Sequence, residues 1–397
     1  MYRTFNWIVP VISIIMFSNM PVLQIGREIV VSSGLVGGVL MVFSCCYVFY
    51  FVSSIIIKSV VGGKRGIFQT VEEFFGKRGA IVCVALVICV FCMWFVIQFR
   101  FLKDSLFLFY SRPELSQLAV FQSFLLYLLC VSLVVASHYS FLICSAVSTV
   151  GNVLSIIYIA YTFFMSIRLQ DVRLYTNSFD LHMALPLLNN LLTTVFAVPI
   201  FYKSNVVYKN TKLNLKLVYF VFLPFLVVLG MIFGFLSPDG PDFMHFCLNH
   251  PKIPRAIILT YLLSSMCFIN MLNLYLSSGF VTYITKVEGR VLPIALVVLL
   301  CIGLFFIQNL ESVLHFFIAS IATMVSMIVT KSAIKQYQDN SEFRRNNIIS
   351  LFISTIILFF CKMNWIKITG LLFFDAVIIA LLFSVHAYRA DEAKAEQ

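Results

Sequence analysis

Residues 193–238 read TTVFAVPIFYKSNVVYKNTKLNLKLVYFVFLPFLVVLGMIFGFLSP, and this stretch decides the fold. It begins as an apolar helix that Pro199 interrupts, passes through a polar run with four lysines, and ends in a second apolar span. A proline inside a membrane helix frees backbone carbonyls that hydrocarbon cannot satisfy, so such breaks occur beside protein or a water-filled cavity. Secondary transporters bind substrates and coupling ions at such breaks. An ordinary proline kink fits this stretch equally well, so the surrounding chain must decide.

The composition indicates a polytopic membrane protein. Of the 397 residues, 61% are hydrophobic and 11% are charged, whereas soluble domains carry roughly 25% charged residues. This excludes a soluble fold. The formal net charge is +11, but the basic residues form short clusters between apolar spans, as the positive-inside rule describes. The lipid bilayer is therefore the expected partner, and no nucleic-acid partner is implied.

The pattern of reactive side chains argues against an enzyme. Ten of the eleven cysteines fall within apolar spans, and neither they nor the six histidines stand at metal-ligand spacing. We therefore expect no disulfide framework, no metal site and no cofactor. A membrane-bound acyl- or glycosyltransferase would need an acidic or histidine-bearing loop at the interface. The best candidate, residues 239–242, is more simply a turn. No catalytic residue is predicted.

A membrane-crossing helix needs about 20 apolar residues, and the chain holds eleven or twelve such spans. They form a single transmembrane domain over residues 1–397, whose first helix lacks a convincing cleavage pattern and is expected to be retained. The predicted spans cover 7–31, 34–60, 80–101, 115–136, 141–164, 183–202, 217–236, 255–275 (or 255–283), 292–308 and 314–330, followed by two short spans within 348–388. An interfacial helix is predicted at 68–75, after the second span.

The distribution of loop charges predicts the topology. The loops after the second, sixth, eighth and tenth spans are rich in lysine and arginine, whereas the other loops hold fewer and mix them with acids. This asymmetry predicts a cytoplasmic N-terminus. The sequence does not distinguish a plasma membrane from a vacuolar or other internal membrane, and it leaves the oligomeric state open.

Three short blocks resemble the amino acid/auxin permease family. The block VEEFFGKRG, which precedes an apolar helix, is similar to that family's junction into the third helix. The residues FAV, followed by NVVYK, are similar to its broken sixth helix, and GMIFGFL is similar to the end of its seventh. These blocks lie at residues 71–79, 196–198 with 205–209, and 230–236.

The resemblance implies a LeuT-like fold of the APC superfamily, in which two five-helix halves form an inverted repeat. Repeat one would cover about 6–164 and repeat two about 183–331, with additional C-terminal helices at 347–388. The implied activity is secondary active transport of amino acids by alternating access. A sodium or proton gradient, or substrate exchange, would drive it.

The resemblance also implies a midplane site between broken helices one and six, where positive helix N-termini face a substrate carboxylate. The expected substrate-binding residues are Ser18, Asn19, Met20, Pro21, Val22, Val195, Phe196, Ala197, Val198 and Pro199. Ion coupling is expected at Asn19, Ser264 and Ser265, because hard cations prefer oxygen ligands. Asn270 and Asn273 are expected to form hydrogen bonds between helices.

Two departures from the family pattern support an alternative function. The family's first helix breaks at a glycine-rich run, whereas residues 20–27 here contain one glycine, and Phe201 stands where relatives often carry histidine. A non-transporting amino acid sensor or scaffold on the same fold is therefore the alternative. Arg27 and Glu28 are either a buried functional pair or residues at the outer interface.

Overall fold

The computed structural model describes residues 20–62, 67–111, 116–166, 213, 215–236, 243–287, 289–333, 341–363 and 375–383. These residues form helices and no strand. Eight of the described helices are long and apolar enough to cross a membrane, by length and composition. The predicted all-helical, multi-pass architecture is confirmed at this level. The number of spans in the whole chain stays a prediction, because residues 1–19 and 167–212 lie outside the described part.

Two long helices contain a glycine turn that divides each into two segments. In α2 (Met20–Gly62), Gly34 has φ 67° and ψ 179°. In α3 (Ile67–Tyr110), Gly76 has φ 64° and ψ 172°. Side chains with a Cβ atom rarely adopt such φ values. The two glycines thus end the first span and the interfacial helix close to the predicted boundaries at 31 and 75.

The next three elements keep most of their predicted limits. The helix α4 covers Gln117–Ala136 and α5 covers His138–Phe164, each with a serine N-cap. The seventh span begins with a π-helical turn, η3 (Val218–Phe222), and continues as α8 (Leu223–Leu236). Pro224 lacks the N–H that would bond to Phe220, which explains why the helix widens there.

The second half of the chain adds one unpredicted helix and lengthens another. The short α9 (Phe243–Asn249) lies in what the sequence indicated as a polar loop, and α10 (Arg255–Thr285) ends two residues beyond the longer of its two predicted limits, 275 and 283. The remaining elements are α11 (Val291–Phe305), α12 (Leu310–Ala333) and α13 (Ser341–Lys362). Residues 375–383 are also helical, and the two short C-terminal spans stay a prediction.

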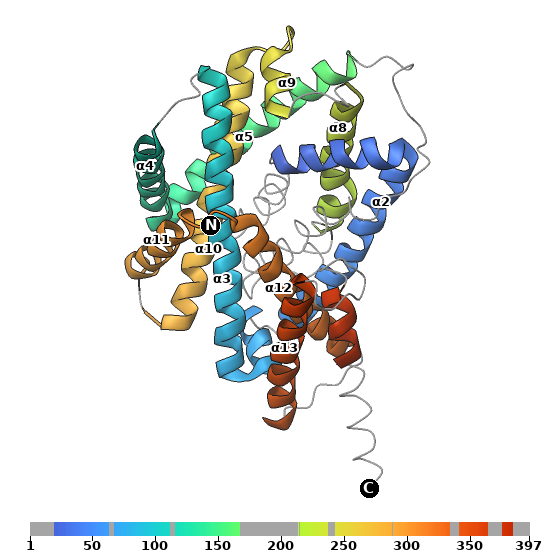
Figure 1. The fold of residues 1–397 in the computed structure, drawn as a ribbon, viewed down its shortest axis with the longest axis vertical. Helices are drawn as coiled ribbons and strands as arrows, with labels where there is room; N and C mark the ends of the chain where they lie inside the picture. The colour runs from blue at the N-terminus through green and yellow to red at the C-terminus, as the bar shows by residue number, and fades with distance from the viewer. Residues whose placement is uncertain are drawn as a thin grey trace.

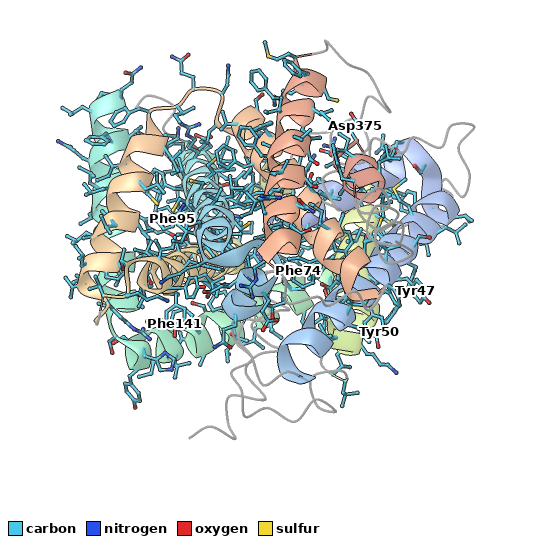
Figure 2. The ribbon with its side chains drawn as sticks, turned by 90° about the horizontal axis from the view of Figure 1, so that it is seen from below. Tyr47, Tyr50, Phe74, Phe95, Phe141 and Asp375 are labelled. Carbon is cyan, nitrogen blue, oxygen red and sulfur yellow. The ribbon has the colours of Figure 1, made fainter. Side chains whose placement is uncertain are left out.

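The helices form two groups (Figure 1). The helices α3, α4, α10 and α11 pack against one another, and α2 packs along η3 and α8. Figure 2 shows the same division from below, with Phe95 of α3 on one side and Tyr47 and Tyr50 of α2 on the other. The helices α5 and α12 each contact helices of both groups.

The helices α2, α3, α4 and α5 can be matched in chain order with α8, α10, α11 and α12. When each helix is exchanged for its match, the contacts between the two sets are the same. The pair α3–α12 corresponds to α10–α5, α3–α11 to α10–α4, and α2–α12 to α8–α5, and all six pairs are in contact. This is the packing expected for a five-plus-five repeat. The residue limits that we assigned to the two repeats remain predictions.

Candidate functional site

Most of the residues predicted to bind substrate cannot be placed. Ser18, Asn19 and the segment 195–199 lie outside the described residues. Met20 and Pro21 begin α2, and Val22 is buried with 1% of its surface exposed. The predicted break in the first helix at residues 18–21 stays a prediction, because residues 1–19 lie outside the described part. Whether the two breaks face each other stays a prediction.

The glycine that remains in the first helix packs against α8. A methyl group on Gly26 would collide with the Val227 carbonyl oxygen, and one on Gly230 would collide with the Leu23 carbonyl. A methyl on Gly234 would meet the Val30 side chain and the Arg27 backbone. Small residues let membrane helices approach this closely. The α2–α8 contact is therefore a backbone-to-backbone seam.

The two serines predicted for ion coupling are placed on α10. The Ser264 hydroxyl donates to the Tyr261 carbonyl at 3.2 Å, and its side chain packs on Gly151 of α5. Ser265 is fully buried, and a side-chain hydrogen bond joins it to Tyr261. Both serine side chains thus bond to Tyr261 on the same helix, and their role in ion coupling stays a prediction.

The charged pair of the first helix is half-buried. The Arg27 guanidinium lies 5.6 Å from the centroid of the Phe233 ring, which is a cation–π distance. The Gln24 amide nitrogen donates to Glu28 Oε1 at 3.3 Å, and the Gln24 Oε1 atom is buried without a hydrogen-bond partner among the described residues. The first segment of α2 thus carries one buried acceptor, Gln24 Oε1, without a partner among the described residues.

Four polar atoms on α3 and α10 are buried without a described partner. They are Trp94 Nε1, Gln98 Oε1, Asn270 Oδ1 and Asn273 Nδ2. Gln98 is 3% exposed, Asn270 is fully buried and Asn273 is 5% exposed. Buried polar groups in native proteins are nearly always hydrogen-bonded, because leaving one unpaired costs about 1–3 kcal/mol. Within the described part of the chain, no hydrogen bond or ring contact joins these four side chains to one another, and we group them by their burial and unpaired polar atoms as the candidate site, called the polar wall.

Two contacts fix the register of α3 against α10. Cys92 and Ser277 lie 3.8 Å apart (Sγ to Oγ), and the rings of Phe91 and Phe280 are 6.1 Å apart. The residue numbers rise on one helix as they fall on the other, so the helices are antiparallel. Gln98 is six residues beyond Cys92, and Asn270 is seven residues before Ser277. At about 1.5 Å rise per residue, Gln98 and Asn270 reach the same depth.

A tyrosine from α4 reaches the polar wall. The Asn270 amide nitrogen donates to the Tyr127 hydroxyl at 3.0 Å, and that hydroxyl lies 3.3 Å from the Met266 carbonyl. The expectation that Asn270 bonds between helices is confirmed. For Asn273 it is not, because its amide nitrogen has no partner among the described residues.

Trp94 and Gln98 are not among the site residues predicted from the sequence. The signal was present in the run CMWFVIQ at 92–98, where an indole and an amide stand four residues apart in an apolar span. Residues at i and i+4 share one face of a helix, and a polar side chain inside a membrane span suggests function. Hydropathy hides such residues, because two polar groups barely change a long apolar window.

Comparisons with known proteins agree with the fold. No family model matches the chain, and no curated protein matches it. Among solved structures, one is described as Mhp1, a nucleobase-cation-symport-1 family transporter in a closed conformation with bromovinylhydantoin bound. It superposes with a TM-score of 0.67 at 12% identity, covering 96% of this chain and 91% of that chain.

The inward-facing conformation of Mhp1 superposes with a TM-score of 0.65 at 13% identity, covering 98% of this chain and 91% of that chain. At such low identity the likeness shows the fold alone. The chain therefore shares the LeuT-like fold of these Mhp1 structures, which is the fold that the resemblance implied.

Proposed function

We propose that this chain is a secondary transporter that carries a small polar molecule across a membrane by alternating access. The polar wall is the observation that carries the proposal, since its four atoms lack described partners deep inside an apolar bundle. Such groups are satisfied in membrane proteins by a ligand or by a water-filled path. The fold supports the same function, because its structural neighbour is described as a transporter with closed and inward-facing conformations.

The first candidate substrate is an amino acid, which follows from the resemblance to the amino acid/auxin permeases. In this version residues 18–22 and 195–199 hold the zwitterion through freed backbone groups. Asn19, Ser264 and Ser265 bind sodium, or a proton gradient or exchange drives transport. Membership of that family is part of this proposal.

The second candidate substrate is a neutral planar ring that carries amide groups, and the polar wall favours it. The four wall residues are uncharged and offer two acceptor atoms and two donor groups. The indole of Trp94 can also stack on a flat ring. The neighbouring Mhp1 structure holds bromovinylhydantoin, a ligand with such a ring. Held by these residues, a ring substrate needs no charged partner.

Uptake into proteoliposomes tests the proposal and separates the two substrates. Radiolabelled amino acids, uracil, cytosine and hydantoin are offered with and without sodium and proton gradients. We expect gradient-dependent uptake of one class, and the polar wall predicts the ring compounds. Uptake of amino acids alone would favour the first candidate. Binding without uptake under either gradient would favour the sensor. If the protein neither binds nor takes up any of these compounds, the proposal is refuted.

A variant of the wall adds a control within the same assay. Gln98→Ala removes a buried acceptor and should lower uptake about tenfold or more, because a ligand N–H is left without its partner. Gln308→Ala removes the same functional group from an exposed position between α11 and α12 and should leave uptake unchanged.

The proposed orientation has the N-terminus in the cytoplasm, and it rests on the loop charges. It would place the interfacial first segment of α3 and the C-terminal end of α10 on the cytoplasmic side. These two ends are joined, since the Tyr283 hydroxyl donates to Glu72 Oε2 at 2.9 Å, and Lys286 Nζ lies 4.1 Å from the centroid of the Tyr283 ring. Labelling of cysteines introduced in the loops tests the orientation.

A further inference from the structure

We propose that Tyr127 is a positioning residue that fixes which atom Asn270 presents to the substrate. The inference rests on the function proposed above and concerns the same site. Tyr127 belongs to α4, and its hydroxyl bonds to the Asn270 amide and to the backbone of α10. It therefore acts on the substrate through Asn270.

The direction of each hydrogen bond follows from the groups involved. The Met266 carbonyl can only accept, so the Tyr127 hydroxyl, 3.3 Å away, donates its hydrogen to it. The Cys267 side chain also contacts this hydroxyl and offers a second, weaker acceptor. With its hydrogen committed, the hydroxyl oxygen must accept from Asn270, whose NH₂ group lies 3.0 Å away. The amide of Asn270 is thereby held in one of its two orientations.

This orientation leaves the Asn270 carbonyl oxygen for a ligand. The Oδ1 atom is buried and has no hydrogen-bond partner among the described residues. An amide turned by 180° would present a donor at the same place and would leave the Tyr127 hydroxyl facing an acceptor. Asn270 thus requires an N–H on the substrate, and Asn273, with its unpaired Nδ2, requires an acceptor.

Packing holds the tyrosine in place independently of any substrate. Its ring lies 6.0 Å from the Phe95 ring and 5.5 Å from the Phe99 ring, measured between centroids. Both phenylalanines are buried on α3, and α4 also packs on α10. Two ring contacts and the packing of α4 on α10 hold the hydroxyl in place, so the amide that binds it is preorganised.

The test compares hydantoin with 1-methylhydantoin and 3-methylhydantoin, each of which lacks one N–H donor. The proteins are the full chain, Tyr127→Phe, Asn270→Ala and the double variant, reconstituted in proteoliposomes. In the unmodified protein one methylated compound should bind about tenfold more weakly than hydantoin, because Asn270 loses its partner. Tyr127→Phe should weaken hydantoin about tenfold and leave that methylated compound unchanged. The double variant should be no worse than either single one.

A merely structural role for Tyr127 would give a different pattern. Loss of packing would weaken all three compounds alike, and losses that multiply in the double variant would mean independent roles. Either result overturns the inference, and so does a Tyr127→Phe variant that keeps the full preference for hydantoin over its methylated form. In each of these cases, uptake of hydantoin by the unmodified protein still supports the proposed function. If the unmodified protein takes up none of the three, the ring substrate is wrong and the inference fails with it.

Tyr158→Phe is the matched control for the loss of a phenol. The Tyr158 hydroxyl donates to the Lys252 carbonyl at 3.1 Å, on α5 and away from the polar wall. This variant should keep the full preference between hydantoin and its methylated forms. A reduced preference in Tyr158→Phe would show that the effect is not specific to Tyr127 and would overturn the inference.

Discussion

The α2–α8 pair and the α3–α10 pair differ in what lies at the contact between the two helices. Gly26 and Gly230 bring the first pair into backbone contact, with no room for a methyl group. Large rings and buried amides lie between or beside the second pair, and the four polar atoms of the wall keep no described partner. The first contact is a rigid seam, whereas the second leaves polar groups to be satisfied by something that binds.

An aromatic cluster joins the two regions. Phe233 of α8 lies 5.3 Å from both Phe243 and Phe246 of α9, and Phe243 lies 6.0 Å from Tyr261 of α10, all between ring centroids. Rings at these distances attract one another and bury large apolar areas. The unpredicted α9 thus packs on both α8, which belongs to the seam, and α10.

Substitution of a seam glycine should have the largest effect. Gly230→Ala places a methyl group against the Leu23 carbonyl, so α2 and α8 must separate. Overpacking of this kind costs about 3 kcal/mol, and we expect most of the protein to be lost from the monodisperse fraction in size-exclusion chromatography.

Gly279→Ala is the control on the other pair. Gly279 is helical, and no atom lies within 4 Å of an added Cβ. A helix gains about 0.5–1 kcal/mol when an unstrained glycine becomes alanine, so this variant should be as stable as the parent or more stable. Equal behaviour of the two variants would contradict the rigid seam.

Replacing a paired and an unpaired buried amide should shift stability in opposite directions. The Asn347 amide donates to the Phe74 carbonyl at 2.7 Å, beside the turn at Gly76 (Phe74 is labelled in Figure 2). Asn347→Leu leaves that carbonyl unsatisfied and should cost about 2 kcal/mol. Gln98→Leu removes an atom that has no described partner and should be neutral or stabilising.

Thermal unfolding in detergent measures both changes, and uptake separates them further. Gln98→Leu should keep the folded protein while lowering uptake about tenfold. A marked loss of thermal stability in Gln98→Leu would mean that Gln98 is a structural residue, and the contrast between the seam and the polar wall would then fail.

A pH effect where the two regions meet should be the smallest. Burial, and then the Lys252 charge, lowers the pKa of His250 below 6.5. Its Nδ1 accepts from the Lys252 backbone N–H at 3.3 Å, and its ring lies 5.5 Å from the Phe246 ring. The unfolded chain therefore binds the proton more readily, and stability falls as the pH drops through 6.5 towards the lower folded pKa.

His250→Gln should reduce this pH dependence. The difference between the thermal midpoints at pH 7.5 and pH 5.5 should be smaller in the variant than in the parent, since the other histidines titrate in both. An equal difference in the two proteins would show that His250 contributes nothing to the pH dependence.

Much of the fold was predictable because the bilayer imposes simple rules on sequence. Gly34 and Gly76 lie within three residues of the predicted boundaries at 31 and 75, and both ends of α4 were predicted within two residues. The helix α3 instead runs on to Tyr110, nine residues beyond the predicted end at 101. The helix α9 was missed, since seven residues between polar turns carry too little periodicity. The π-turn before Pro224 was also missed, although the proline that causes it was visible.

The candidate site was less accessible to sequence analysis. The predicted residues at 18–19 and 195–199 lie outside the described part and stay predictions. Trp94 and Gln98 were overlooked because two polar groups barely lower the hydropathy of a long apolar span, and only the packed helices show that their polar atoms are buried. Asn270 and Asn273 were noticed, but nothing local distinguishes an amide that is paired from one that is not.

The sequence by itself determined the membrane class and the approximate spans, because hydrocarbon demands long apolar helices and penalises every exposed backbone group. The expectation of a LeuT-like fold came from the resemblance of three short blocks to a known family. The tertiary structure alone decided which glycines touch, which amides find partners and which atoms remain unpaired. These properties depend on distances of a few ångströms between segments far apart in the chain, and such distances are set by packing rather than by local pattern.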